Sequence, residues 1–179
     1  MTFAFHLKAM ARLYADVGRR FELAKPASDA KLRALEAKLG RGVPAALRAA
    51  WRKCDGTACP LFARPGFLTA YALLSVRDAG LARAAMRKRA PQYESDATAR
   101  DRRVRPSWFE PGWLPFAGFG GGSLLLLVDL SPSARGKNGQ IIAFTHDPDE
   151  IAWVAPSFEA LLGLSKRAFE KDRDELLLT

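Results

Sequence analysis

The chain has 179 residues, of which 49% are hydrophobic and 26% are charged, a balance that excludes a disordered chain and is typical of one folded domain. Its net charge is +9, and its two cysteines, Cys54 and Cys59, are too few for a disulfide-rich scaffold, so both thiols are expected to be reduced. No run of 15 or more apolar residues occurs near the first residue, so no signal peptide or membrane span is visible and a cytoplasmic location is expected.

The charge is unevenly distributed along the chain. Residues 1–53 carry 12 Lys or Arg against four Asp or Glu, whereas residues 106–179 carry six against ten. A basic front half can meet an acidic protein, a nucleic acid or an anionic surface. Charge alone therefore leaves the class of partner open.

A helix is predicted over residues 2–20 and forms an N-terminal extension, 1–25, before the main domain. Its apolar stripe at helical spacing consists of Phe5, Ala9, Leu13 and Val17. Because this stripe lacks interfacial tryptophan, we expect the helix to lie on the core rather than on a membrane.

Two short helices are predicted next. The first is expected to begin at Ser28 or Asp29, either of which can act as its N-cap, and to end at Gly40. Pro44 suits the first turn of a further helix, which ends at residues 55–56.

The middle of the chain carries weaker signals. A strand is weakly indicated at residues 61–62 and more clearly over 69–76, and a helix is predicted over 77–89. The residues of that helix expected to face inward are Leu81, Ala85 and Met86. Residues 91–106 are charge-dense and poor in apolar side chains, so we expect a flexible Arg-rich loop.

An apolar run over residues 123–130 predicts a strand that is buried on both faces or turned through a corner. Asn138-Gly139 follows it and is a strong turn signal, because both residues tolerate the positive φ of a tight reversal. Residues 140–145 should therefore return antiparallel to the first run.

A second turn is predicted at residues 147–149, and another strand should follow it at 151–154. Ser157 then precedes an apolar helical pattern and is expected to cap it. Residues 166–179 are expected to form a charged C-terminal helix or tail. The side chains expected to form the core between sheet and helices are Trp113, Phe116, Leu125, Leu127, Ile141, Phe144 and Phe158.

Several motifs follow one another in a recognisable order. They are Leu-Gly-x-x-Val-Pro at 39–44, Asp-Gly at 55–56, Trp-x-Pro-Phe at 113–116 with three glycines after it, Asp-Leu-x-Pro at 129–132 and Gly-Gln-Ile at 139–141. Together they resemble the SUKH superfamily, which contains fungal cell-wall-assembly regulators and many bacterial immunity proteins. The resemblance implies one α+β domain over 26–165, with a mainly antiparallel sheet and helices packed against it.

No complete catalytic, cofactor or metal motif is present, so none of these sites is expected. The glycines at 118–122 run into a strand instead of opening a helix, which favours a structural loop over a phosphate-binding one. His146 and its acidic neighbours lie on a predicted turn and lack the spacing of a calcium loop. The carboxylate of Asp129 is expected to cap the backbone amides of the turn that follows it.

Three classes of function are weighed. The resemblance implies a non-enzymatic protein-binding module, most concretely a bacterial immunity protein that neutralises a toxin. The alternatives are a nucleic-acid-binding or regulatory scaffold protein that uses the basic N-terminal half, supported by charge alone, and an enzyme of unrecognised type. We prefer the first class, and expect neither a membrane nor a nucleic acid as partner.

The expected partner is a toxin domain with an acidic or neutral surface, because like charges across an interface cost binding energy. Trp108 lies beside Phe109 in a proline-bounded loop and is expected to be an exposed anchor. The residues expected to bind or steer the partner are Arg87, Lys88, Arg89, Arg102, Arg103, Arg105 and Trp108.

Overall fold

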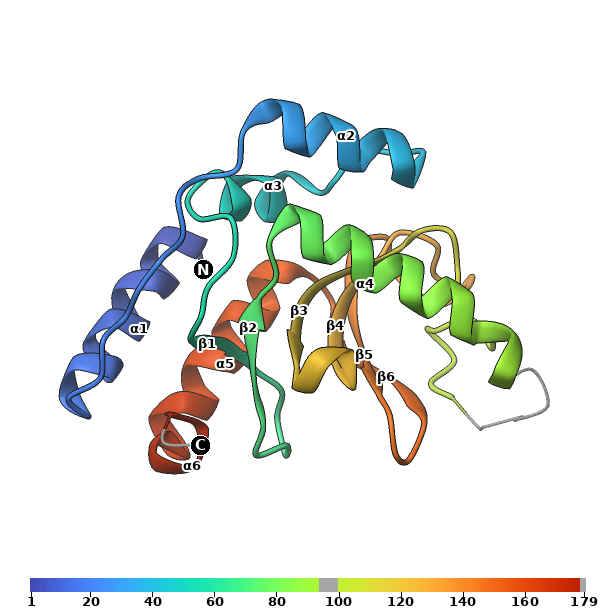
Figure 1. Ribbon diagram of the computed structural model, residues 1–179. Helices are drawn as coiled ribbons and strands as arrows, with labels where there is room; N and C mark the ends of the chain where they lie inside the picture. The colour runs from blue at the N-terminus through green and yellow to red at the C-terminus, as the bar shows by residue number, and fades with distance from the viewer. Residues whose placement is uncertain (94–99, 178–179) are drawn as a thin grey trace.

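Figure 1 shows the computed structural model, which describes residues 1–93 and 100–177. Its centre is an antiparallel sheet in which every strand pairs with the next one along the chain, in the order β1-β2-β3-β4-β5-β6. The strands are β1 (Pro60–Ala63), β2 (Ala70–Leu73), β3 (Trp113–Phe119), β4 (Leu124–Asp129), β5 (Gln140–Thr145) and β6 (Glu150–Ala155). The expected α+β architecture is confirmed.

Helices cover both sides of this sheet. They are α1 (Phe3–Asp16), α2 (Asp29–Leu39), α3 (Ala45–Trp51), α4 (Val76–Arg89), α5 (Phe158–Lys171) and α6 (Arg173–Leu177), with short 3-10 helices η1 (Ala90–Tyr93) and η2 (Gly120–Gly122). None of the described helices is long and apolar enough to span a membrane.

The predicted turns and caps of the meander are confirmed. Gly139 has a φ of 86°, and β4 pairs residue for residue with β5 on either side of the reversal. The Ser157 hydroxyl accepts a hydrogen bond from the Ala160 amide at 3.2 Å and begins α5. Ser28 caps α2 in the same way, and Gly40 ends it in the left-handed conformation.

β3 lies in the interior of the sheet although it contains Pro115, a residue that argues against a central strand. The sequence alone therefore did not predict this strand. The pairing of β3 with β4 shifts between Pro115 and Ala117, which makes Phe116 a bulge. The Phe116 carbonyl accepts a hydrogen bond from the Leu74 amide at 2.9 Å, so the irregularity is stabilised from β2's side.

We call the side of the sheet that carries α1, α3 and α5 the α5 face. Phe116 from β3 and Phe62 from β1 meet here with ring centroids 5.5 Å apart. Phe158 from α5 packs 5.4 Å from Phe116 and 5.9 Å from Phe62. These three rings join the helical layer to the sheet, and α1 packs beside α5 (Figure 1).

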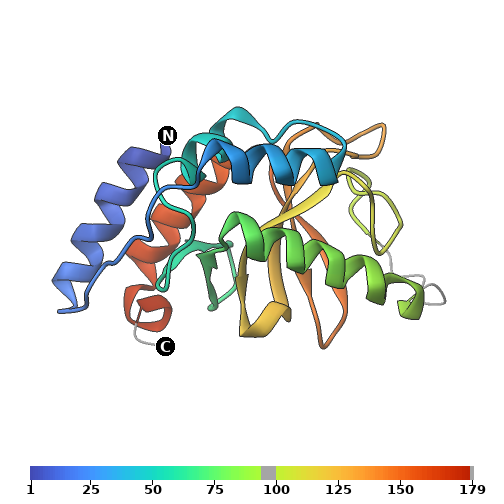
Figure 2. The same cartoon turned by 45° about the horizontal axis from the view of Figure 1, so that its top comes forward.

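The opposite side, which we call the α4 face, has a smaller apolar cluster beneath α4 and the segment 100–110 (Figure 2). Its centre is formed by Trp113, Leu127 and Phe144 from the sheet. The seven expected core residues are all buried, but they divide between the two faces. The sheet therefore separates two core layers, because successive residues of a strand point to opposite sides.

The expected inward stripe of α1 is correct only in part, because Leu13 and Val17 pack against the core but Phe5 does not. Phe5 is 55% exposed, whereas the buried residues of α1 are Phe3, His6, Met10 and Tyr14. His6 can be buried because its Nε2 lies 2.7 Å from the Leu61 carbonyl oxygen, which supplies a hydrogen-bond partner.

α4 differs from expectation in the same way. Leu81 is 56% exposed and Ala85 is exposed, whereas Met86 is buried as predicted. Val76 and Ala79 are also buried. The helix is rotated so that its small residues meet α2 and the sheet, which leaves Leu81 outside.

The ends of the chain are part of the fold. The buried residues of α1 belong to the α5-face core, so the extension 1–25 packs on the domain. The boundary expected after residue 165 falls within α5, which continues to Lys171, and Leu176 and Leu177 are buried beyond it. Of the expected flexible loop 91–106, residues 94–99 lie outside the described residues.

Candidate functional site

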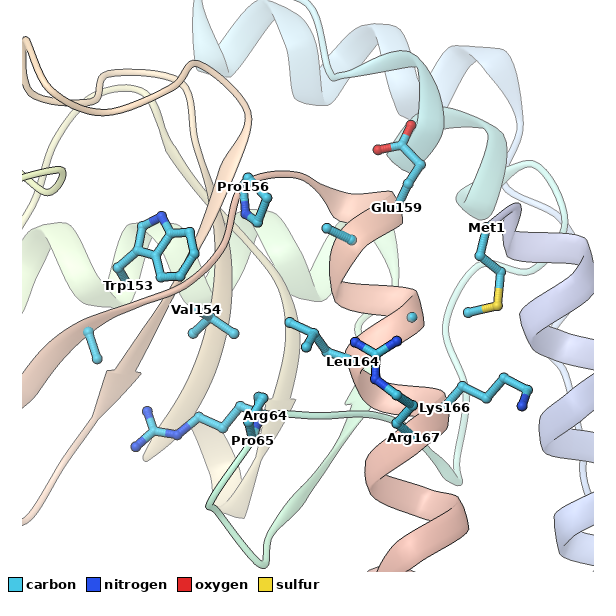
Figure 3. Close-up of a pocket in the computed structure, with 13 residues that line it drawn as sticks. Met1, Arg64, Pro65, Trp153, Val154, Pro156, Glu159, Leu164, Lys166 and Arg167 are labelled. Atoms are coloured by element: carbon cyan, nitrogen blue, oxygen red, sulfur yellow. The ribbon is translucent and has the colours of Figure 1, made fainter.

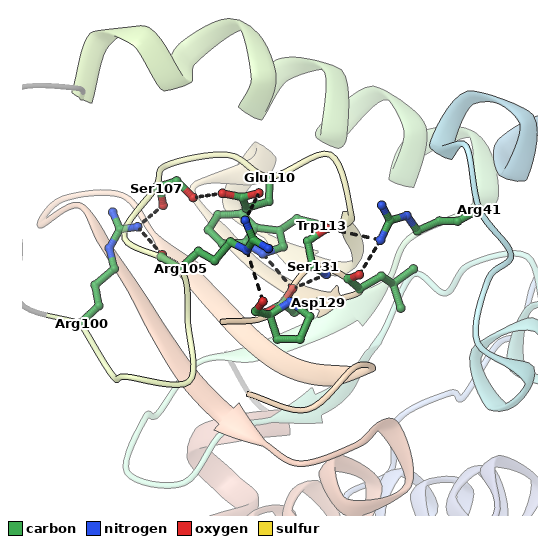
Figure 4. A network of polar contacts seen from close by, with 10 residues as sticks. Arg41, Arg100, Arg105, Ser107, Glu110, Trp113, Asp129 and Ser131 are labelled. Atoms are coloured by element: carbon green, nitrogen blue, oxygen red, sulfur yellow. Dashed lines mark hydrogen bonds and ion pairs between the residues drawn. The ribbon is translucent and has the colours of Figure 1, made fainter. Parts of the chain in front are cut away.

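Asp129 is the most deeply buried carboxylate in the part of the chain that is described. Its Oδ1 accepts from Trp113 Nε1 at 3.0 Å and from the Ser131 amide at 2.9 Å (Figure 4). Its Oδ2 accepts from Gln140 Nε2 at 2.9 Å. Burial raises the pKa of Asp129 above its ordinary value, and these three hydrogen bonds oppose that shift. Both oxygens are engaged inside the protein, so Asp129 joins β3, β4 and β5 and caps the turn as predicted.

The segment 100–110 is fastened to the turn between β4 and β5. The Gln140 side chain donates to the Arg103 carbonyl at 2.9 Å, and Arg105 Nε donates to the Pro132 carbonyl at 3.2 Å. Arg100 donates to the carbonyls of Arg105 and Ser107, as Figure 4 shows. The bonds of Gln140 and Arg105 therefore hold the segment beside the β4–β5 turn, and Arg100 bonds within the segment itself.

One groove of about 430 Å³ lies between α4 and the β3–β4 hairpin. Its walls include Leu81 and Phe119, which are 56% and 50% exposed, and Arg89 also lines it. We call it the α4 groove. Leu81 and Phe119 are two of six exposed large apolar side chains among the described residues, so their meeting at one groove makes it a candidate contact surface.

A larger groove of about 1000 Å³, which we call the α5 groove, lies between β6 and α5 (Figure 3). Its apolar lining comes mainly from Trp153 and Val154 of β6 and Leu164 of α5. Cationic side chains also line it: Arg64, Lys166 and Arg167, with Glu159 near the start of α5. The groove thus combines an apolar wall with positive charge.

A comparison with family models matches residues 26–163 to the SMI1 / KNR4 family (SUKH-1), which is more than half of the chain. The chain belongs to this family. A search of curated proteins finds no match. The SUKH-1 match covers the whole sheet and leaves out α1 and α6.

Membership of SUKH-1 is consistent with an immunity or regulatory module, and the family is generally non-catalytic and associated with protein–protein interaction. The resemblance to the SUKH superfamily is thus confirmed at the level of the family.

The structure divides the partner residues expected in this SUKH-1 chain into two groups. Arg87 and Lys88 are exposed on α4, and Arg102 is exposed beside Val104, which is buried. Arg103, in contrast, bonds Asp101 and lies 3.5 Å from the centre of the Trp153 ring.

The other two cations are partly engaged. Arg89 lies 5.6 Å from the centre of the Phe144 ring, and Arg105 lies 3.9 Å from a Glu110 carboxylate oxygen. All six cations belong to the C-terminal end of α4 or to the nearby segment 100–110 (Figure 2).

Trp108 is not the exposed anchor that the sequence suggested. It is 8% exposed, packs 4.8 Å from the Tyr93 ring and lies beneath the Arg100 guanidinium at 4.2 Å. The exposed apolar residues near this face are instead Leu81 and Phe119. Leu81 is a large apolar residue among small and charged residues of α4, and it was assigned to the core.

The remaining candidate motifs have structural roles. The glycine run forms the hairpin turn between β3 and β4, with positive φ at all three residues of η2. His146 Nδ1 lies 2.7 Å from an Asp149 carboxylate oxygen, within the β5–β6 turn. Among the described residues, no group of three or more His, Cys, Asp or Glu side chains is placed to hold a metal ion. Both cysteines are free, and Cys54 is buried.

Proposed function

We propose that this SUKH-1 protein is a non-enzymatic protein-binding module and, more specifically, a cytoplasmic bacterial immunity protein that neutralises a toxin by covering part of its surface. The observation that carries the proposal is the α4 groove, where exposed Leu81 and Phe119 meet beside Arg89. Exposed apolar residues that share a concave site with charged neighbours are typical of a protein-binding hot spot.

The charge around the α4 groove supports an acidic or neutral partner surface. Arg87 and Lys88 are exposed on the same helix, and Arg102 is exposed on the segment 100–110, beside the β4–β5 turn. Cations at the rim of an interface accelerate encounter with an acidic surface and repel a basic one. Leu81 and Phe119 then supply the affinity, and the cations supply the association rate.

The first experiment uses the product of the neighbouring reading frame as the toxin and asks whether co-expression of this chain restores growth. We expect Leu81→Asp and Phe119→Asp each to weaken binding about tenfold or more, because a carboxylate is then placed in an apolar contact. Phe5→Asp is the matched control, since Phe5 is 55% exposed on α1, away from the α4 groove. Loss of binding in Phe5→Asp to the same extent would contradict the proposed surface.

The second experiment reverses the charge of Arg87, Lys88 and Arg102 to glutamate. We expect association to slow about tenfold and to lose most of its salt dependence, while dissociation is nearly unchanged. Stopped-flow mixing at several salt concentrations measures both rates. A change confined to the dissociation rate contradicts a steering role.

The control for that variant reverses Lys8, Arg12 and Lys38, which are exposed on α1 and α2 and change the net charge equally. Equal slowing in both variants would show that only total charge acts. Tight binding of random-sequence DNA or RNA that falls steeply between about 50 and 200 mM salt would overturn the proposal in favour of a nucleic-acid binder.

A further inference from the structure

β6 is an edge of the sheet, and its outer side opens onto the α5 groove. It pairs only with β5, and no hydrogen bond from another described element reaches the backbone of residues 150–155. Alternate N–H and C=O groups of an edge strand point away from the sheet and are available to another extended chain. The α5 groove runs along this edge, because Ala152, Trp153 and Val154 all line it.

The α5 side of the groove is kept open by a glycine that the fold does not need. Gly163 lies within α5, where glycine costs about 1 kcal/mol relative to alanine. A Cβ at this position meets only Arg167 Nη1, at 3.7 Å, which is an ordinary contact. Ala160 and Gly163 both line the groove, so this side of α5 presents two small residues to it.

The chain neutralises the cations of the α5 groove only in part. Arg64 is 15% exposed, its Nη1 is buried with no hydrogen-bond partner, and its nearest carboxylate is Glu150 at 3.9 Å. Arg167 is exposed and has no hydrogen bond or ion pair within the described residues. Lys166, by contrast, is paired with Glu170. Two arginines that line the groove therefore keep donors without a hydrogen-bond partner among the described residues, although Arg64 also lies over the Phe67 ring.

We propose that the α5 groove binds an extended, acidic segment of a partner protein, which adds to β6 as a seventh strand. The open edge of β6 provides backbone hydrogen bonds, and the apolar wall takes every second side chain of the segment. A carboxylate of the segment lies between Arg64 and Arg167. This site is separate from the α4 groove and does not depend on the proposed immunity function.

The open strand edge is what selects a polypeptide over other anions. A small amphipathic acid could use the apolar wall and the arginines, but it would leave the β6 edge unpaired. A peptide satisfies the backbone and the arginines together, which is the usual basis of strand addition. Acidic side chains on the peptide are preferred, because three cationic residues and one acidic residue, Glu159, line the groove.

The test uses a dye-labelled peptide of ten residues in which valine alternates with glutamate, and its anisotropy is followed as the whole chain is added. The matched probe replaces every glutamate with lysine. We expect the glutamate peptide to bind at least about tenfold more tightly than the lysine peptide. Dodecanoate, a fatty acid, is the competitor that tests for a small amphipathic anion.

Two pairs of variants locate the site. Gly163→Trp fills the α5 groove and should reduce affinity at least about tenfold, whereas Gly163→Ala should leave it unchanged. Arg167→Glu should weaken binding by a similar factor, and Lys38→Glu, an equal charge change on α2, should alter it less than twofold. Circular dichroism confirms that each variant is folded.

Hydrogen exchange distinguishes strand addition from simple attraction of charge. Bound peptide should slow amide exchange of residues 150–155 by about tenfold or more and leave α4 unaffected, since only paired outer amides are protected. The proposal is overturned if the peptide does not bind at millimolar concentration, if the lysine peptide or dodecanoate binds equally well, or if Gly163→Trp has no effect. None of these outcomes bears on the α4 groove, which is tested by Leu81→Asp.

Discussion

The α5 face is covered by helices that share a large apolar core with the sheet and add a few hydrogen bonds to β1, whereas the α4 face is covered by one helix and by the segment 100–110, which contains four arginines. On the α4 face, arginines lie over aromatic rings: Arg103 over Trp153, Arg100 over Trp108, Arg89 over Phe144 and Arg83 over Phe109. Much of the positive charge is therefore used to cover a core. A count of basic residues overstates how much of that charge is free for a partner.

The largest expected effect concerns Trp113, at the centre of the α4 face. Trp113→Ala should lower the free energy of unfolding by about 3 to 5 kcal/mol, because it removes a buried ring. It also leaves Asp129 without one of its three donors. Trp113→Phe keeps most of the packing and should cost about 1 to 3 kcal/mol through the lost N–H. Urea unfolding measures both, and an unchanged midpoint for Trp113→Ala would show that this cluster does not stabilise the fold.

The second prediction compares two neighbouring arginines of the segment 100–110. Arg103→Ala should destabilise by about 1 to 2 kcal/mol, because its guanidinium lies 3.5 Å from the Trp153 ring centre and bonds the Asp101 carboxylate. The Arg102 side chain is exposed, and Arg102→Ala should change stability by less than about 0.5 kcal/mol. Chemical unfolding of the two variants provides the comparison. Equal effects would mean that the arginines do not cover the α4 face as described.

The elements that could be predicted from sequence are those with local causes. The reversal at Asn138-Gly139 and the caps at Ser28, Gly40 and Ser157 depend on backbone chemistry within a few residues, and each occurs where expected. The family could be recognised for the same reason, because its motifs are mostly turns and caps.

The orientation of helices could not be predicted, because it depends on distant residues. In α1, the buried side includes the polar residue His6, and the partner of its Nε2 is the Leu61 carbonyl, far along the chain. In α4, Leu81 was assigned to the core because the sequence of the helix does not show that α2 packs at the neighbouring Gly80, which leaves Leu81 exposed. The α4 groove was therefore missed. Trp108 was taken as exposed because only the folded structure shows that the Arg100 guanidinium lies over its ring.

The third prediction is a pH dependence that arises on the α5 face. Burial lowers the pKa of His6 below its ordinary value of 6.5, the hydrogen bond to Leu61 opposes this, and Lys166 adds to it. The unfolded chain therefore binds this proton at higher pH than the folded chain. The stabilisation is complete above about pH 6.5 and is lost as the pH falls, by at most about 1.4 kcal/mol per pH unit.

His6→Gln tests this assignment, because a glutamine amide can still donate to the Leu61 carbonyl but does not titrate. The difference in unfolding free energy between the variant and the parent should shrink or change sign from pH 7.5 to 5. Taking this difference cancels the contribution of Asp129, whose raised pKa acts with the opposite sign at acidic pH. Parallel pH profiles for the two proteins would exclude His6 as the cause.

The smallest expected effect compares two helical glycines, one on each side of the sheet. At Gly163 a Cβ meets only the Arg167 side chain, at 3.7 Å, whereas at Gly80 of α4 it meets Leu35 of α2, at 3.8 Å. Gly163→Ala and Gly80→Ala should each stabilise the protein by about 0.5 to 1 kcal/mol, because alanine favours the helix. A larger side chain should have different effects on stability at the two positions.

Gly80→Leu should cost about 1 to 3 kcal/mol, since its outer atoms meet Leu35 and push α2 away from α4. Gly163→Leu should cost nothing measurable, because its side chain enters the α5 groove. Thermal unfolding resolves a difference of this size, as about 1 kcal/mol shifts the midpoint by a few degrees. If Gly163→Leu were as destabilising as Gly80→Leu, the groove beside β6 would be closed in solution, and an added strand would have no room for its side chains.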